Sequence, residues 1–169
     1  MKRKIVLSLA LLVLLMPAGQ ALSDKNIESA ARFFKAKEYK KAIGLLKEIT
    51  KEDHSNANAW VLLGNCYLIL EKNKKAIKVY KNAIRIDPEN EEAFLGLGRT
   101  YSVMREYSNG IEAYKKVIEI NPKHAEAHYE LGVSYDRTVN LSYAFEQYKI
   151  LKTLDKRLAD KLYHIILGK

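Results

Sequence analysis

The chain has 169 residues, of which 48% are hydrophobic, and its 29 Lys and Arg against 20 Asp and Glu give a formal net charge of +9. This length is sufficient for a continuous packed core. The single cysteine, Cys66, excludes an internal disulfide. Its inward position on a predicted helix indicates a small core residue and not a reactive thiol.

The first residues predict a secretory signal peptide over residues 1–21. Three basic residues at 2–4 precede an apolar run from Ile5 to Met16, and Gly19-Gln20-Ala21 has the small-x-small pattern of a cleavage site. The run is short of the roughly twenty residues of a membrane span, so we expect cleavage after Ala21, with an uncleaved anchor as the alternative. No cysteine lies near this site, which excludes a lipoprotein anchor. We therefore expect residues 22–169 to be exported, to the periplasm.

Residues 22–169 are organised in units of 34 residues, at about 23–56, 57–90, 91–124 and 125–158. Apolar residues three, four and seven apart predict two amphipathic helices in each unit. The expected helices are 57–70 with 73–85, 91–104 with 107–119, and 125–138 with 141–154. The recurring residues are Trp60, Leu63, Gly64, Tyr67, Ala76, Tyr80, Ala83 and Pro88, then Phe94, Leu97, Gly98, Tyr101, Gly110, Tyr114 and Pro122, then Leu131, Gly132, Tyr135, Ala144 and Tyr148.

Gly64, Gly98 and Gly132 fall in the middle of predicted helices, where glycine costs about 1 kcal/mol relative to alanine. Three such costs at one spacing indicate a common cause, a close approach between helices that leaves no room for a side chain. The opposite surface is expected to come from small residues on each second helix, namely Ala76, Gly110 and Ala144. The recurring tyrosines are expected to fill the seams between the helices.

Both ends of the array depart from the pattern, as end repeats do. The copy at 23–56 has Asn26, Ala30, Phe33 and His54 in place of the tryptophan, glycine, tyrosine and proline. Residues 156–167 continue the apolar period with a charged opposite side, which predicts a helix that caps the last repeat.

The pattern Trp60-x-x-Leu63-Gly64-x-x-Tyr67, with its continuation to Pro88, resembles the tetratricopeptide repeat (TPR) family. The resemblance implies an all-α fold, a right-handed α-solenoid of stacked helix-turn-helix repeats with a C-terminal capping helix. It also implies that the first helix of each repeat lines a concave groove.

The groove positions implied by the resemblance form four rows: Val61, Leu95 and Tyr129; Asn65, Arg99 and Val133; Leu68, Ser102 and Asp136; Ile69, Val103 and Arg137. An apolar row beside polar residues suits a peptide with a few apolar anchors. The candidate binding residues are Val61, Asn65, Leu68, Leu95, Arg99, Tyr129 and Arg137. The alternative is that Val61 and Leu95 pack between neighbouring helices and only polar residues face the groove. The lysines with which some family members hold a C-terminal carboxylate are absent, so that clamp is not expected.

No phosphate-binding loop, nucleophile elbow or metalloprotease motif occurs, so the sequence gives no reason to expect an enzyme, a cofactor or a catalytic residue. His124 and His128 are four residues apart, but no third ligand is near them in the sequence. We expect no metal site, a loop position exposed to solvent for His124, and a seam-filling position for His128.

These features predict a non-catalytic protein-interaction module: an exported adaptor or scaffold that binds a peptide or protein partner in its groove during assembly of an envelope complex. One alternative is a homo-oligomeric scaffold in which end repeats stack through Ile27, Phe33 and Phe34. Another is an accessory subunit of an envelope enzyme.

A row of cations recurs along one predicted second helix, at Lys74, Lys78, Lys81 and Arg85. It is either an ordinary solvated face or a surface attracted to an anionic one, such as the lipid headgroups of a membrane in a weak contact or an acidic partner. A nucleic-acid partner is not expected for an exported chain without a binding motif.

Overall fold

The computed structural model describes residues 18–168, with side chains from Ile27 onward. The described residues form helices and no strand, which confirms the all-α prediction. The helices are α1 (Ala18–Lys35), α2 (Tyr39–Glu52), α3 (Ala57–Ile69), α4 (Asn73–Ile86), α5 (Glu91–Val103), α6 (Tyr107–Ile120), α7 (Ala125–Arg137), α8 (Leu141–Leu154) and α9 (Lys156–Ile166). The predicted bounds of α3 to α9 agree with these to within one residue. Most of the predicted signal peptide, residues 1–17, lies outside the described residues.

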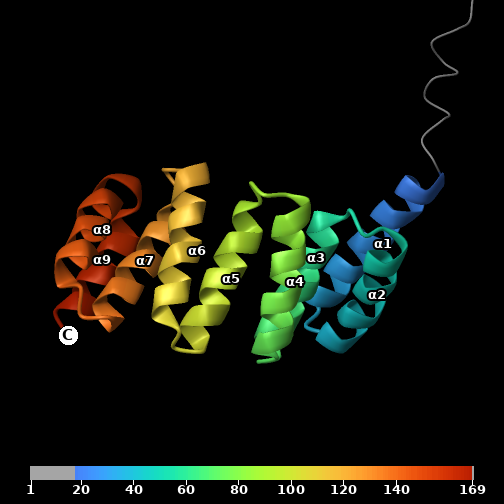
Figure 1. The fold of residues 1–169 in the computed structure, drawn as a ribbon, viewed down its shortest axis with the longest axis horizontal. Helices are drawn as coiled ribbons and strands as arrows, with labels where there is room; N and C mark the ends of the chain where they lie inside the picture. Colours follow the sequence, from blue (N-terminus) through green and yellow to red (C-terminus); the bar gives the residue numbers. More distant parts are fainter. Residues whose placement is uncertain (1–17, 169) are drawn as a thin grey trace, which may run out of the picture.

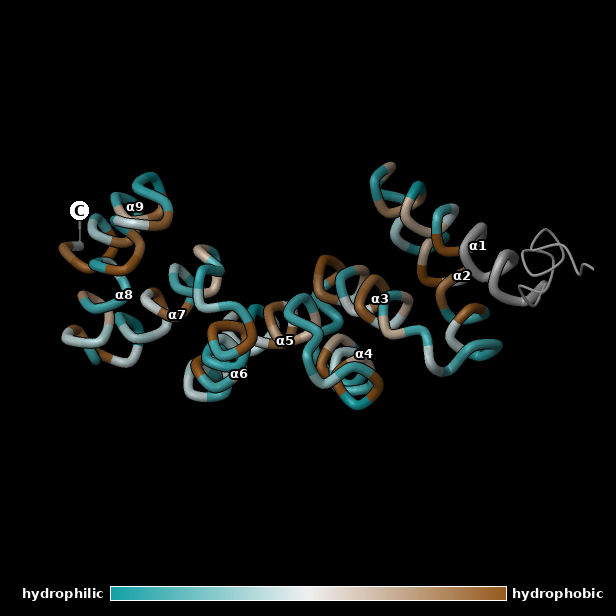
Figure 2. The backbone as a smooth tube through the Cα atoms, turned by 90° about the horizontal axis from the view of Figure 1, so that it is seen from above, coloured by the Kyte–Doolittle hydropathy of each residue, from teal (hydrophilic) through white to brown (hydrophobic). Residues whose placement is uncertain are grey.

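The helices stand side by side in chain order along one axis (Figure 1). Seen from above, the row bends into an arc with α4 and α6 on its outer side (Figure 2). Each helix packs on the next one, and α3, α5 and α7 also contact one another in succession, whereas among the described helices no such contact joins α4 to α6. The odd-numbered helices therefore form the inner row of an α-solenoid. No helix in the described part of the chain is long and apolar enough to cross a membrane.

The inner helices begin at side chains that cap them. The carboxamide of Asn90 accepts a hydrogen bond from the backbone N–H of Ala93 at 2.9 Å, and Asn56 caps α3 in the same way. His124 Nδ1 accepts from Ala127 N–H at 3.2 Å, and Asp155 accepts from Leu158 N–H at 3.1 Å. Each cap satisfies one of the backbone donors that a helix start leaves without a partner. His124 thus lies in the loop between repeats, as predicted, but it is a half-buried N-cap, so its predicted exposure to solvent was wrong.

The turn inside each helix pair has one geometry, repeated four times at the 34-residue spacing. Its left-handed residues are Lys37, Glu71, Arg105 and Val139, with φ between 55° and 61°. After each of them a backbone N–H reaches back to close the first helix, as from Lys72 to the carbonyl of Tyr67 at 2.8 Å. Because Lys37 belongs to this series, the copy at 23–56 keeps the turn of the other repeats despite its altered sequence.

The mid-helix glycines lie where another side chain fills the space. A Cβ atom built on Gly64 would stand 2.5 Å from Cε1 of Tyr80, and one on Gly98 would stand 2.5 Å from Cε1 of Tyr114. Both rings are fully buried. The tyrosine ring therefore occupies the room that the glycine leaves, whereas the sequence predicted a small residue of the second helix opposite it; Gly110, where a Cβ atom would stand 3.3 Å from the carbonyl oxygen of Gly98, fits that prediction. The same Tyr80 ring also covers Gly96 in the next repeat, so one ring joins two units.

In the last repeat a different side chain packs over the mid-helix glycine. Over Gly132 lies the side chain of Leu162 from α9, and not a tyrosine. The corresponding Tyr148 is only partly buried and stacks on Tyr163, with ring centroids 5.1 Å apart. The reason is that α9 packs on both α7 and α8 in the place where the first helix of a further repeat would stand. Helix α9 thus caps the array, as predicted, with Leu162 as its central buried side chain.

At the other end, Ile27, Phe33 and Phe34 pack against the first core cluster and are partly buried. They offer less free apolar surface for end-to-end stacking than the sequence suggested. Cys66 is fully buried, as predicted, and burial raises the pKa of its thiol to about 11. Its thiolate is therefore scarce at neutral pH.

Candidate functional site

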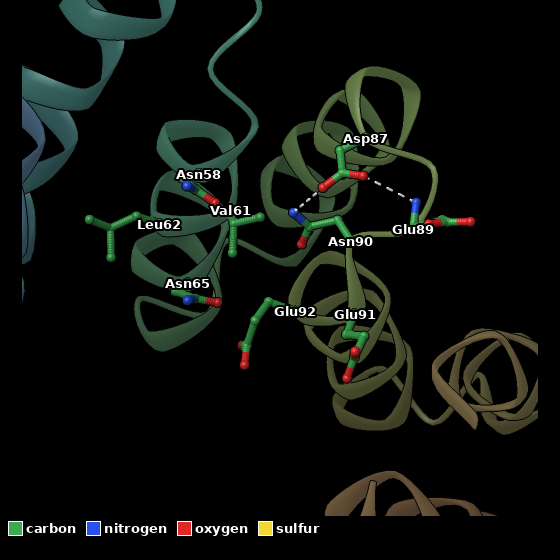
Figure 3. Close-up of a pocket in the computed structure, with 9 residues that line it drawn as sticks. All are labelled: Asn58, Val61, Leu62, Asn65, Asp87, Glu89, Asn90, Glu91 and Glu92. Atoms are coloured by element: carbon green, nitrogen blue, oxygen red, sulfur yellow. Dashed lines mark hydrogen bonds between the residues drawn. The ribbon is translucent and has the colours of Figure 1, made fainter. Parts of the chain in front are cut away.

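An open pocket of about 520 Å³ lies on the inner side of the arc between α3 and α5. Helix α3 contributes Asn58, Val61, Leu62 and Asn65, and the α4–α5 loop with the start of α5 contributes Asp87, Glu89, Asn90, Glu91 and Glu92 (Figure 3). Four carboxylates and no Lys or Arg line it. The pocket is therefore strongly anionic, in a chain whose overall charge is positive.

The four carboxylates are not equivalent. Asp87 is occupied by its own loop, because it accepts from the Glu89 N–H at 3.2 Å and from Asn90 Nδ2 at 2.9 Å. Glu89 and Glu92 are exposed, and neither pairs with a cation among the described residues. Figure 3 shows Glu92 in the space between α5 and Asn65, whereas Glu89 lies at the edge of the pocket and its side chain is directed away from α3. Glu92 within the pocket and Glu89 at its edge are thus the charges that are free to meet a ligand.

Asn65 is oriented by a buried tyrosine. The Tyr80 hydroxyl donates a hydrogen bond to Asn65 Oδ1 at 2.6 Å. Burial raises the pKa of Tyr80 well above its usual value, so the hydroxyl keeps its proton and remains a donor. With Oδ1 engaged, the Asn65 amide group has its two N–H donors left for the groove. That arrangement suits a carbonyl acceptor on a bound chain.

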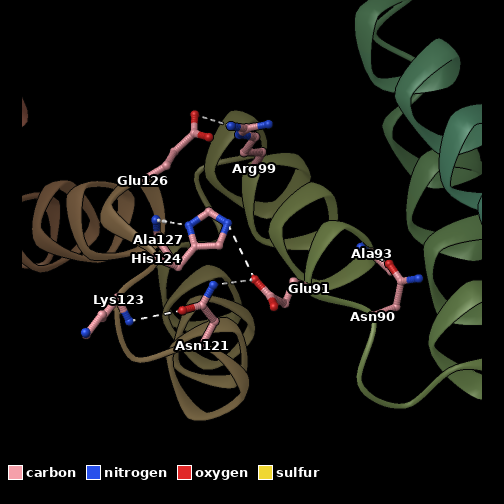
Figure 4. A network of polar contacts seen from close by, with 9 residues as sticks. All are labelled: Asn90, Glu91, Ala93, Arg99, Asn121, Lys123, His124, Glu126 and Ala127. Carbon is pink, nitrogen blue, oxygen red and sulfur yellow. Dashed lines mark hydrogen bonds and ion pairs between the residues drawn. The ribbon is translucent and has the colours of Figure 1, made fainter. Parts of the chain in front are cut away.

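The next inner position, between α5 and α7, is closed by paired charges (Figure 4). Arg99 forms an ion pair with Glu126 across the groove. Glu91 accepts from Asn121 Nδ2 at 3.0 Å, and its carboxylate lies 4.0 Å from His124 Nε2. Since His124 Nδ1 is an acceptor, the ring proton of the neutral imidazole sits on Nε2 and faces Glu91. The charged side chains in this part of the groove are therefore paired or hydrogen-bonded with one another.

Glu130 lies beside that network and is half-buried. Burial raises the pKa of its carboxyl group, and the nearby Arg99 lowers it by a smaller amount. A further pocket of about 460 Å³ follows between α7 and α9, and contains Tyr129 and Glu130 together with Arg157 and Lys161. Its mixed charge contrasts with the anionic pocket between α3 and α5.

The predicted groove residues fall into two groups. Val61 and Leu95 are 8% and 2% exposed, so their side chains pack between helices, as in the second of the two interpretations. Asn65, Arg99 and Tyr129 reach the inner surface. Leu68 is half-buried against the first core cluster, and Arg137 is exposed at the end of α7. Ile69 and Val103, which were placed in the groove but left out of the candidate binding residues, are 46% and 59% exposed.

The loop carboxylates were missed as site residues. The candidate binding residues all lie on the first helices of the repeats, and the run Asp-Pro-Glu-Asn-Glu-Glu at 87–92 was not among them. The structure places the same run over the inner pocket. Four acidic residues in six, without an alternating cation, was the signal that could have identified it.

The two histidines do not converge. His128 is buried, with Nδ1 2.7 Å from Gln147 Oε1 and Nε2 3.0 Å from the carbonyl of Pro122, so it fills the seam between α7 and α8 as predicted. His124 caps α7. Within residues 27–168, no three His, Cys, Asp or Glu side chains are arranged to hold a metal.

Comparison with known structures gives the same fold. The crystal structure of MamA aligns with a TM-score of 0.76 at 24% identity, over 82% of this chain and 81% of that one. YrrB, described as a TPR protein with an unusual peptide-binding site, aligns with a TM-score of 0.73 at 21% identity, over 88% and 80% of the two chains. The TPR domain of Arabidopsis OM64 aligns with a TM-score of 0.66 at 20% identity, over 69% and 97%. At these identities the likeness concerns the fold alone.

Sequence comparison identifies the repeats themselves. No curated protein gives a significant match. The family described as "TPR repeat" matches residues 64–102 and 106–138, from the middle of α3 to the end of α7. Repeat period, helix pairing and family match agree, and the chain contains tetratricopeptide repeats within residues 64–138.

Proposed function

We propose that this chain is a non-catalytic exported adaptor that holds a segment of a partner protein in its inner groove during assembly of an envelope complex. Solenoids of this kind are protein-interaction modules and bind through their concave surfaces. The observation that carries the proposal is the open pocket between α3 and α5, because its neighbour between α5 and α7 has already paired its charges. The export and envelope part of the proposal rests on the signal sequence predicted at residues 1–21.

The pocket selects a class of partner by its chemistry. Glu89 and Glu92 offer unpaired negative charge, and the Asn65 amide offers N–H donors. A segment with Lys or Arg side chains beside an accessible backbone carbonyl would satisfy both. Ile69 and Val103, at the far ends of α3 and α5, provide exposed apolar contacts for a neighbouring side chain. The partner segment is therefore cationic with apolar flanks.

A peptide library displayed on phage, selected against the purified chain, tests this function. Selected peptides should be enriched in Lys and Arg, and calorimetry should show affinity at least tenfold weaker for Asn65→Ala and for Glu92→Gln. That loss corresponds to about 1.4 kcal/mol. Glu112→Gln on the outer helix α6 is the matched control and should bind normally. Equal affinity in all four proteins would remove the groove from the function.

Export is tested separately. Mass spectrometry of the protein recovered from the producing cell should give a chain that begins at Leu22, outside the cytoplasm. A cytoplasmic chain that retains residues 1–21 would contradict the exported role and leave the binding role standing.

A further inference from the structure

Helix α4 has an exposed face made only of cations. Its exposed charged residues are Lys74, Lys75, Lys78, Lys81 and Arg85, and it contains no acidic residue. None of the five forms an ion pair with a described residue; Lys75 alone lies near an aromatic ring, 5.9 Å from the centroid of Tyr67. The equivalent outer helix α6 differs, because Lys115 and Lys116 pair with Glu112 and Glu119. The positive charge of α4 is therefore unbalanced within its own repeat.

Most of this charge does not stabilise α4, although Arg85 lies in the last turn, where the helix dipole favours a cation. Lys74 and Lys75 lie in the first turn, where the positive end of the helix dipole disfavours cations. Lys74 and Lys78 are also like charges at the i,i+4 spacing, as are Lys81 and Arg85, and such pairs repel. A helix that keeps these charges against its own stability is suited to meeting an anionic surface.

The same molecule carries such a surface on the opposite side. The pocket between α3 and α5 presents Glu89 and Glu92 without cations, beside Asp87 and Glu91. The cations from Lys74 to Arg85 extend over about 16 Å of helix, close to the length of the inner helices that flank the pocket. Because α4 lies on the outer side of the arc (Figure 2) and the pocket lies between the inner helices α3 and α5, a molecule cannot fill its own pocket. A second copy can.

We propose that the cationic face of α4 in one copy docks into the anionic pocket between α3 and α5 of another, so that the chain self-associates head to tail. The two surfaces are different patches, so the contact is heterologous and generates a ring or an open row of copies. The inference rests on the proposed function in that it uses the same groove. A cationic partner peptide therefore competes with self-association.

Sedimentation velocity tests the contact. The sample is the whole protein, purified as the cell produces it and measured over a series of concentrations. Wild type should associate in 50 mM NaCl and dissociate in 0.5 M NaCl, since screening weakens exposed charge pairs. Two charge-reversed variants test the two surfaces one at a time. One carries Lys74→Glu/Lys78→Glu/Lys81→Glu on α4, and the other carries Glu89→Lys/Glu92→Lys in the pocket. Each reversed protein alone should associate at least tenfold more weakly than wild type.

The mixture of the two reversed proteins is the decisive sample. Each pocket in the mixture again meets an α4 face of opposite charge on the other protein, so association should return. Lys115→Glu/Lys116→Glu on α6 carries a similar charge change elsewhere on the outer side and should associate like wild type. Monomeric wild type at low salt, or reversed proteins that stay monomeric when mixed, would overturn the contact.

Two further outcomes distinguish this contact from other roles. Wild type that remains monomeric but binds vesicles containing phosphatidylglycerol would overturn it in favour of a lipid surface for α4. Wild type that remains monomeric but binds selected peptides would overturn it and leave the proposed function intact. Association that is normal in both reversed proteins would also overturn it.

Discussion

The glycine at 98 can be tested against a glycine that has no packing role. Gly98→Ala places a Cβ atom 2.5 Å from Cε1 of Tyr114, whose ring is fully buried and hydrogen-bonded through its hydroxyl to Ser102 Oγ at 3.1 Å. Gly44→Ala, in the middle of α2, places a Cβ atom with nothing within 4 Å. The two substitutions make the same chemical change in helices of similar length, so their difference isolates the ring contact.

The two substitutions should change the free energy of unfolding in opposite directions. Alanine gains about 1 kcal/mol over glycine in a helix interior, so Gly44→Ala should stabilise the fold by roughly that amount. At Gly98 the same gain is opposed by an overpacking cost of about 1–3 kcal/mol, because an ordinary contact needs the ring to move by nearly 1 Å. Gly98→Ala should therefore lose up to about 2 kcal/mol, and Gly98→Leu should cost about 1–3 kcal/mol. For a domain of this size, each kcal/mol shifts Tm by about 2–4 °C.

Urea unfolding followed by circular dichroism at 222 nm measures both variants. The midpoints should move in opposite directions at an unchanged m-value. In a background of Tyr114→Ala, which removes the ring, Gly98→Ala should become stabilising, and the double-mutant cycle gives the coupling. Equal stabilisation by Gly98→Ala and Gly44→Ala would refute the close-approach explanation.

Three other predictions follow from individual residues. Val139→Asn should stabilise the fold by about 0.5–1 kcal/mol in thermal melts, because a β-branched residue is strained at φ 60°; Arg105→Asn at the equivalent turn should gain less. Glu130→Gln should stabilise at pH 7 and make no difference below pH 4.5: the raised folded pKa means that stability is present at low pH and is lost as pH rises through it. Cys66 should react with iodoacetamide only as urea unfolds the chain, and mass spectrometry detects the added mass. A labelled Cys66 in the native protein would contradict its burial.

The sequence was sufficient for the helices because one spacing carried several independent signals. Gly64 and Gly98 recur with the tyrosines that cover them, so the period specified both partners of the contact. The inner surface was harder to predict. A helix offset gives the direction of Leu95 but not the distance to the next inner helix, and that distance is what buries its side chain.

The loop residues show a second limit. His124 was placed in a loop by its position between repeats, but its ring turns back to cap α7. Glu89 and Glu92 are far from Asn65 in sequence, and only the bend of the array brings them to one pocket. Local pattern does not contain that bend.

The rings of Tyr80 and Tyr114 have unlike neighbours, and this makes successive junctions of the array chemically distinct. Tyr80 lies between Gly64 and Gly96, and its hydroxyl donates a hydrogen bond to Asn65 Oδ1. One period after Gly96 the chain has Glu130, whose charge is felt at Tyr114. Protonation of Glu130 therefore removes a charge beside Tyr114, at a position where the preceding junction has only the hydrogen of Gly96.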